Sequence, residues 1–450
     1  MVSHIEILLG EYDSAVSFNT LAIAADQRTM SSCPSTSSPS SFFVGYVAHD
    51  YHMKCFAAML GGYESESRSA ASGLRSLITD KLLHENPALR DGCEAFAPVH
   101  VLVLVRFGRW DEVLKLSAFS HDAALMPVTV ATILFGRAVA LAARGNVDEA
   151  IVESNAFNVA REAVRKTKRF LHNNSCIDIL DVEGEVLRGE VLYADGKFSD
   201  AFSCLRNAVK KEAELNFDEP WGTMIPVRHA LGALLLHRAK ANMERGKSNA
   251  YRPPSADKKD DILKPRELLA EAEAVFRADL VMYPKNPWAL TGLIETLELL
   301  VVLGGGGSSA SSSCDCAASN AATADDEDDQ SSSYKIIDEL KSTLAASKSS
   351  TMYEPTPHNT KFSPRTRLTA NPPHPAPLHP FPILLARPAQ VRLQDKQLLR
   401  LREQEKQRIV DKYYKPLTCL LLEKNQAQKP RNKKTRTRTI VACVLFTFII

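Results

Sequence analysis

Histidine is the residue type in this sequence that most readily suggests chemistry, because its imidazole binds metal ions and exchanges protons near neutral pH. The chain of 450 residues contains 12 histidines. His49 and His52 are three residues apart and could share one face of a helix, while His4 and His100 lie in or near segments with a helical pattern. Zinc sites usually contain close ligand pairs such as H-E-x-x-H or C-x-x-C, and neither occurs here. The sequence therefore predicts histidines that pack between helices rather than a metal site.

Other spacings that could support chemistry are weaker still. His229 and His237 are two helical turns apart, too far to chelate one ion together. Cys314 and Cys316 form a C-x-C inside a Ser-rich run, where a chance pair is the simpler interpretation than a soft-metal site. Neither a G-x-x-x-x-G-K-[ST] phosphate loop nor a G-x-S-x-G elbow occurs. We expect no catalytic, cofactor-binding or metal-binding residues and no cofactor, so the chain is predicted not to be an enzyme. An enzyme or metalloprotein that uses unmarked histidines is the alternative.

The elements that carry these residues are organised by a recurring pattern of a glycine, an aromatic or branched residue two positions later, and a small or apolar residue five positions after the glycine. Copies begin at Gly10, Gly61, Gly108, Gly145 and Gly196, with an interrupted sixth at Gly246. A glycine that ends one helix in a left-handed conformation, followed by a new helix, forms a helical hairpin. The small residue lets the two helices approach closely. Glu66 departs from the pattern in the second copy.

The first copy starts close to the beginning of the sequence. Gly10 needs a helix before it, and nine residues precede it. We therefore expect the first hairpin to lack part of its opening helix, through a truncated N-terminus. The apolar side chains of Ile5, Leu8 and Leu9 would then need another partner.

Residues 269–293 contain the unit that resembles a known family best. Ala272, Phe276 and Pro284 have the spacing of the alanine, aromatic and closing proline in the second helix of a tetratricopeptide repeat. Asp279 replaces the second small residue of that helix. The chain resembles tetratricopeptide repeat proteins of a divergent, long-repeat type over roughly residues 4–300.

Two further stretches support the same resemblance. Asn286, Trp288 and Gly292 resemble the opening of a following repeat, and Ala201 and Ala208 have similar spacing in the repeat before. The resemblance implies an all-α fold, an α-α superhelix of stacked helical hairpins. It also implies a non-enzymatic scaffold or adaptor that binds a protein or peptide ligand.

Family members grip their ligands in a concave groove lined by the first helix of each pair. By this resemblance Arg137, Arg188, Arg228 and His229 are candidates for the groove. The pattern does not orient these side chains, so the binding residues remain unknown at this stage. Neither the partner nor the oligomeric state follows from the sequence.

Composition divides the chain further. We expect a helical repeat domain over residues 1–300, interrupted by a Ser/Pro-rich insertion at 28–46 and a polar insertion at 247–264. The segments expected after it are a disordered Gly/Ser/acidic linker at 301–333, a possible last repeat helix at 334–348, a Pro-rich disordered segment at 349–390, a charged helical segment at 391–428, and a basic stretch with a short apolar tail at 429–450.

Charge and cysteine usage bound the function classes. The formal net charge is only +2, which gives no reason to expect a specific nucleic acid. The nine cysteines show no framework spacing, which fits a reducing compartment, and we expect a cytoplasmic protein. The basic stretch 429–438 and the apolar run 440–450 leave a membrane- or RNA-associated adaptor as an alternative. That apolar run is too short to span a hydrocarbon core, so a transmembrane anchor is not expected, and interfacial contact of the tail with a membrane is the weaker alternative.

Overall fold

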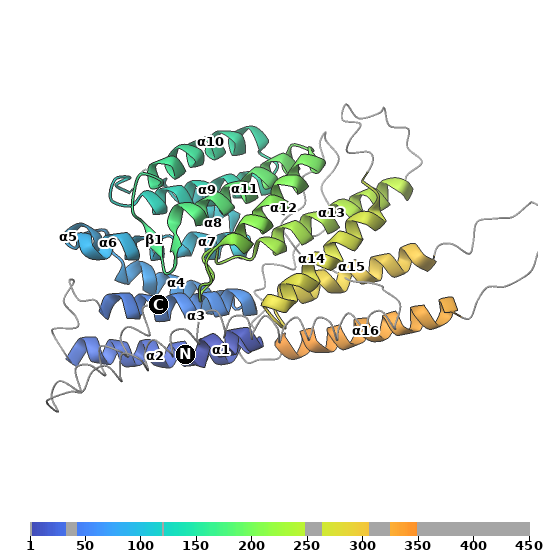
Figure 1. Cartoon of the computed structure of the whole chain (residues 1–450), viewed down its shortest axis with the longest axis horizontal. Coiled ribbons are helices and arrows are strands. Elements are labelled where there is room, and N and C mark those ends of the chain that lie inside the picture. The colour runs from blue at the N-terminus through green and yellow to red at the C-terminus, as the bar shows by residue number, and fades with distance from the viewer. Residues whose placement is uncertain (1, 33–42, 119–120, 248–262, 306–324, 349–450) are drawn as a thin grey trace, which may run out of the picture. The chain divides into compact units, whose positions relative to one another are not determined.

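The computed structural model describes residues 2–32, 43–118, 121–247, 263–305 and 325–348. The segments predicted at 349–390, 391–428 and 429–450 lie outside these residues. The contacts divide the chain into two compact units, Met1–Leu385 and Ala386–Ile450, and the description below concerns the first. Its described residues are mostly helical (Figure 1), with one short pair of strands. The predicted all-α fold class is confirmed.

Five helical hairpins share one kind of turn. In each hairpin the helix before the turn packs against the helix after it. The pairs are α1 (Val2–Leu9) with α2 (Tyr12–Ser32), α3 (Phe43–Gly61) with α4 (Glu64–Leu77), α7 (Val99–Arg106) with α8 (Trp110–Lys115), α9 (Pro127–Ala143) with α10 (Val147–Val164), and α11 (Cys176–Ala194) with α12 (Phe198–Glu214).

The five turns repeat the same backbone hydrogen bonds. A glycine with positive φ, between 63° and 80°, follows the first helix in every pair. The amide of the next residue then donates to the carbonyl five residues earlier, as in Asn146 to Leu141 (3.0 Å) and Lys197 to Leu192 (2.9 Å), which is the Schellman pattern. The residue five positions after the glycine is completely buried in every case: Ala15, Ser67, Val113, Ala150 and Ala201. The structure thus confirms the helical hairpins expected from the glycine pattern.

Two of the predicted turn glycines were wrong. Gly61 belongs to α3, and the left-handed turn residue is Gly62, with φ of 80°. With this shift of one residue the buried position is Ser67, so Glu66 is no longer an exception. Gly246 lies inside the helix that extends to Lys247 and forms no turn.

The remaining elements connect and extend these hairpins. The short helices α5 (Asp80–Glu85) and α6 (Pro87–Cys93) and the 3-10 helix η1 (Glu94–Phe96) precede α7, and the strands β1 (Phe170–Leu171) and β2 (Asn174–Ser175) form a tight hairpin before α11. The last helices are α13 (Val227–Lys247), α14 (Pro265–Met282), α15 (Pro287–Gly305) and α16 (Asp325–Lys348), and each packs against the next.

Helices extend into three segments that were expected to be irregular. In the insertion expected at 28–46, α2 continues to Ser32 and α3 begins at Phe43. In the linker expected at 301–333, residues 301–305 belong to α15 and residues 325–333 to α16. In the insertion expected at 247–264, the first residue, Lys247, still belongs to α13. Low-complexity composition identified the position of each segment but placed its borders too far into the flanking helices.

Buried side chains form two main clusters, one from α1 to α11 and one from α11 to α16. Phe276 is central to the second cluster and is 2% exposed. Its ring lies against Gly232 of α13 and Gly292 of α15, where an added Cβ would collide with it. The two glycines therefore let α13 and α15 approach the aromatic side chain of α14 closely.

Helix α15 also has the length and apolar composition of a membrane-spanning helix, and it is the one helix of this kind within the described residues. Of its stretch 287–304, 56% is buried inside the protein. It packs against α14 and α16, which is the position of a core helix.

Candidate functional site

The first hairpins contact the turn between α14 and α15, although more than 200 residues separate them in sequence. The Tyr12 hydroxyl donates to the carbonyl of Pro284 (2.8 Å), and the Trp288 Nε1–H donates to the carbonyl of Met59 (2.8 Å). Gly10 touches the backbone of Pro284 so closely that any Cβ there would clash. We call this contact region the junction.

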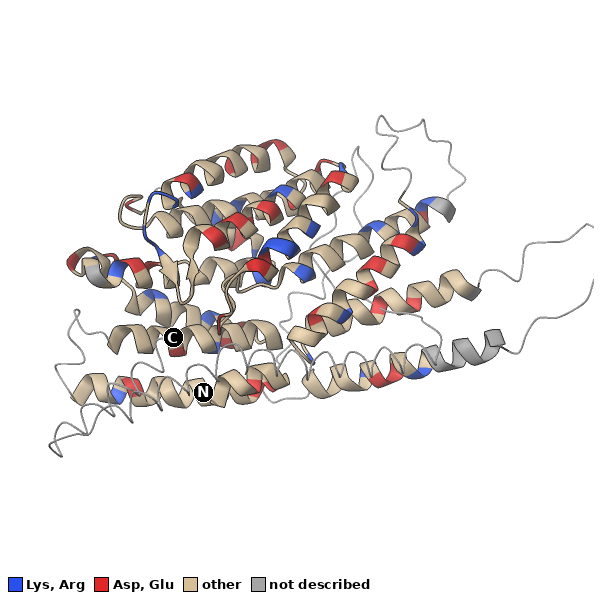
Figure 2. Ribbon diagram, in the orientation of Figure 1, with Lys and Arg blue, Asp and Glu red and all other residues tan. Residues whose placement is uncertain are grey.

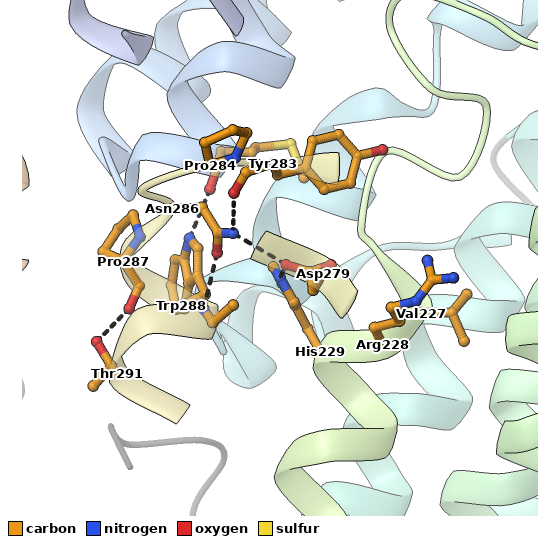
Figure 3. A network of polar contacts seen from close by, with 12 residues as sticks. Val227, Arg228, His229, Asp279, Tyr283, Pro284, Asn286, Pro287, Trp288 and Thr291 are labelled. Carbon is orange, nitrogen blue, oxygen red and sulfur yellow. Dashed lines mark hydrogen bonds and ion pairs between the residues drawn. The ribbon is translucent and has the colours of Figure 1, made fainter. Parts of the chain in front are cut away.

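A polar network lies beside the junction (Figure 3). His229 of α13 donates from Nε2 to Asp279 Oδ2 of α14 (2.6 Å), and Asn286 Nδ2 donates to the same carboxylate oxygen (3.0 Å). Arg106, at the end of α7, donates from Nη1 to His229 Nδ1 (2.7 Å). Its guanidinium also covers the Trp288 ring at 3.9 Å from the centroid. The imidazole of His229 thus links α7, α13 and α14, and Asn286 joins the network through Asp279.

The electrostatics of the network fit a neutral imidazole between two ions. Burial lowers the pKa of Arg106 to about 9, and Asp279 opposes this effect. Burial also lowers the pKa of His229, against the attraction of the Asp279 carboxylate. With Nδ1 accepting from Arg106 and Nε2 donating to Asp279, both ring nitrogens are occupied, and His229 is only 5% exposed. This is the arrangement of a structural histidine, since a general base needs a free nitrogen that substrate can reach.

A second group, the histidine cluster of His4, His49, His52 and His172, lies where α1 and α3 meet the β1–β2 hairpin. Neighbouring rings are 5.4 Å apart between centroids for His4 and His49, for His49 and His172, and for His52 and His172. His52 Nδ1 and His172 Nε2 share a hydrogen bond of 3.2 Å. His49 and His52 were predicted to pack between helices. His52 does so, because it is fully buried.

Burial keeps the inner members of the histidine cluster neutral. It lowers the pKa of His52 well below its ordinary value and that of His172 to about 3, and in both cases the neighbouring imidazoles add to the effect. His4 Nδ1–H donates to Glu219 Oε2 (2.7 Å), which gives the outer end of the cluster a carboxylate partner. Within the part of the chain that the structure describes, no three His, Cys, Asp or Glu side chains are arranged to hold a metal ion.

The loop before α13 is fixed to the β1–β2 hairpin by amide side chains. Asn174 Nδ2 donates to Asp218 Oδ2 (2.7 Å) and to the carbonyl of Asn216 (2.9 Å), and its Oδ1 accepts from the Asn216 amide (2.8 Å). Burial raises the pKa of Asp218 to about 7, against these hydrogen bonds. The loop is thereby held against α1 and α3, where it forms one wall of a pocket.

A small pocket lies beside the junction. Its walls are largely aromatic and aliphatic and come from α1, α3, the loop before α13 and the end of α14. The residues that define it are Ile7, Met53, Phe56, Trp221, Met282 and Tyr283, and His4 and Glu219 lie at its polar edge. Leu8, which is 41% exposed, also lines it. Walls of this composition favour contact with apolar rather than charged groups.

The first hairpin also exposes several large apolar side chains. Ile5 is 58% and Leu21 67% exposed, and these residues belong to a set that we call the N-terminal apolar face. The set consists of Val2, Ile5, Leu8, Leu9, Phe18 and Leu21. Leu8 joins the face to the pocket. Several large exposed apolar side chains on one hairpin are typical of an interaction site.

The groove candidates from the sequence do not gather at one site. Arg137 donates to Glu153 (2.8 Å) and to the carbonyls of Leu114 and Leu116, so it ties α9 to its neighbours. Arg188 is exposed on α11. Arg228 is 3.9 Å from Glu212, next to His229, which the polar network holds.

The remaining histidine and cysteine candidates are also dispersed. His237 Nδ1 contacts the Tyr193 hydroxyl (2.5 Å), and His100 contacts the carbonyl of Ala97 (3.2 Å). Cys314 and Cys316 lie outside the described residues.

Sequence reasoning did not identify Arg106 or the joining of the four histidines. The available signal was Asp279, the acidic residue at a position where the resembled family has a small one.

No protein-family model, curated protein or solved structure matches the chain.

Proposed function

We propose that this chain is a non-enzymatic helical-repeat protein of the tetratricopeptide type that binds another protein and acts as an adaptor in the cytoplasm. The repeated hairpin turn and the tetratricopeptide-like spacing around Phe276 support this proposal. The observation that carries it is Leu8, an exposed apolar side chain of α1 that also lines the apolar pocket at the junction. Apolar side chains on a surface and an apolar pocket beside them are the features by which helical proteins anchor a partner.

The site has a fixed base, which favours recognition over catalysis. The loop that forms one wall is fixed by Asn174, and the end of α14 that forms another is held by the polar network around Asp279. A site whose walls are already ordered spends less free energy on ordering when a ligand binds. The polar side chains beside it, His4 and Glu219, already bind each other (2.7 Å).

Site-specific photo-crosslinking in a cell lysate tests the proposal. A photoreactive amino acid replaces Leu8, at the mouth of the pocket, in the full chain. The matched control carries it at Val159 of α10, which is 74% exposed and far along the chain from the pocket. We expect discrete protein adducts at Leu8 that are absent at Val159. No adducts at Leu8, or the same adducts at both positions, would contradict a binding site here.

A further inference from the structure

The pocket beside the junction has aromatic rings in more than one of its walls. The aromatic side chains that line it are Phe56, Phe217, Trp221 and Tyr283. Phe56 of α3 and Tyr283 at the end of α14 meet edge to face, with 6.0 Å between their ring centroids. Phe217 and Trp221 of the loop before α13 do the same at 6.1 Å. Ring systems from separate segments of the chain therefore converge on one small pocket.

The carboxylates of the pocket give it a negative charge. Asp218 and Glu219 line it together with His4, whose Nδ1–H donates to Glu219 (2.7 Å). The described residues that line it include no lysine or arginine. Acidic and basic residues are both spread over the helices (Figure 2), so charge of a single sign in the pocket is a local feature.

The negative charge of Asp218 is incompletely compensated by its neighbours. Its carboxylate accepts hydrogen bonds from Asn174 Nδ2 (2.7 Å) and from the Asn173 amide (3.1 Å). Burial nevertheless raises the pKa of Asp218 to about 7, and the neighbouring Glu219 adds to the effect. A cation in the pocket would therefore stabilise the ionised carboxylate.

We propose that the pocket binds a trimethylated lysine side chain of the partner protein. This inference rests on the proposed function and names the group of the partner that the pocket holds. The walls disfavour ordinary charged groups, but a quaternary ammonium carries its charge beneath methyl groups that are themselves apolar. Aromatic rings attract such cations, and tryptophan does so most strongly. An unmodified lysine would lose hydration that these walls cannot replace.

The carboxylates separate this ligand from two others. A neutral apolar side chain would fit the walls but would gain nothing from Asp218 and Glu219. The choline headgroup of a phospholipid carries the same quaternary ammonium, but its phosphate would be repelled by these carboxylates. The charges therefore favour a methylated lysine over an apolar residue and over lipid.

Titration of the full chain with three small probes tests the proposal. The probes are the Nα-acetyl amides of trimethyllysine, of lysine, and of a neutral isostere in which carbon replaces the charged nitrogen. Saturation-transfer NMR measures their dissociation constants. We expect trimethyllysine to bind at least about tenfold more tightly than the other two, because it alone combines methyl surface with charge. Equal binding of trimethyllysine and the neutral isostere would overturn the proposal.

Two variants separate the contributions of the rings and the charge. Trp221→Leu keeps an apolar side chain and removes the ring, so trimethyllysine should bind about tenfold more weakly while the isostere keeps its affinity. Glu219→Gln removes a charge at constant shape and should weaken trimethyllysine about threefold or more, again without changing the isostere. A loss of folding would weaken both probes. The control Phe18→Leu, at an exposed ring of α2 outside the pocket, should change neither affinity.

The site, the source of the ligand and the adaptor function are tested separately. Trimethyllysine binding that Trp221→Leu leaves unchanged would place the cation elsewhere and overturn the proposal. Co-sedimentation with phosphatidylcholine vesicles that is lost in Trp221→Leu would assign the pocket to lipid instead. If Leu8 captures proteins but no probe binds, the ligand chemistry is wrong while the adaptor function stands. If trimethyllysine binds but Leu8 captures nothing, the ligand chemistry holds and the adaptor function is refuted.

Discussion

Replacing His172 should change how the stability of the protein depends on pH. Burial among other imidazoles lowers the pKa of His172 in the folded protein to about 3, from an ordinary value of 6.5. Between these two values the unfolded chain binds a proton that the folded chain does not. The folded protein is therefore most stable, with respect to this group, above pH 6.5. Its free energy of unfolding decreases as the pH falls from 6.5 toward 3.

The size of the effect follows from the two pKa values. At pH 5 the unfolded imidazole is almost fully protonated and the folded one almost fully neutral, which destabilises the folded protein by about 2 kcal/mol relative to pH 8. The suitable substitution is His172→Asn, because His172 has a φ of 49° and asparagine tolerates this left-handed conformation. The variant removes the titrating group while it keeps a side chain that can form hydrogen bonds.

Urea unfolding followed by circular dichroism at pH 8 and pH 5 measures the effect. At pH 8 the variant should be about 1 kcal/mol less stable, because His52 loses its ring partner. At pH 5 it should equal or exceed the unmodified protein. His84→Asn, at an exposed histidine of α5, is the control and should not alter the pH dependence. If the stability difference between H172N and the unmodified protein is the same at both pH values, burial of His172 in the neutral form is refuted.

Two further substitutions test other parts of the structure. Burial raises the pKa of Glu183 from 4.5 to about 8, so the folded state loses stability as the pH rises through this range, by about 5 kcal/mol at pH 9. Glu183→Gln should therefore raise the melting temperature at pH 9 much more than at pH 5, and an equal change at both pH values would exclude this cause. Gly196→Val places a branched residue at a φ of 80° and should lower the free energy of unfolding by about 1–2 kcal/mol. The control Gly45→Val adds a side chain in open space on α3 and should not lower it. Equal melting temperatures for G196V and G45V would refute the left-handed turn.

Local pattern predicted the hairpins well because each turn is determined by residues close together in sequence. A glycine, its neighbour and the small residue five positions later suffice to form the Schellman turn and the tight first helical turn. The pattern failed at Gly61 because two consecutive glycines offered two registers, and Tyr63 fitted the wrong one. It failed at Gly246 because α13 continues through that position.

The candidate site was much less predictable, because its residues come from distant segments. Nothing near His4, His49 or His172 in the sequence indicates that their rings stack, since α1, α3 and the β1–β2 hairpin meet only in the folded chain. The exception was the N-terminal apolar face. Ile5, Leu8 and Leu9 were expected to need another partner, and all three are exposed.

The junction has a consequence for the order in which the chain folds. The hydrogen bond from Tyr12 to Pro284 links residues 272 positions apart, whereas each hairpin turn forms between neighbours. During synthesis the first hairpin leaves the ribosome long before its acceptor carbonyl exists, and contacts between such distant residues form slowly. We therefore expect the inner hairpins to assemble first and the junction to close last. Until then the surface of α1 and α2 that later meets residues 283–288 stays open, and a nascent chain would depend on chaperones most in that interval.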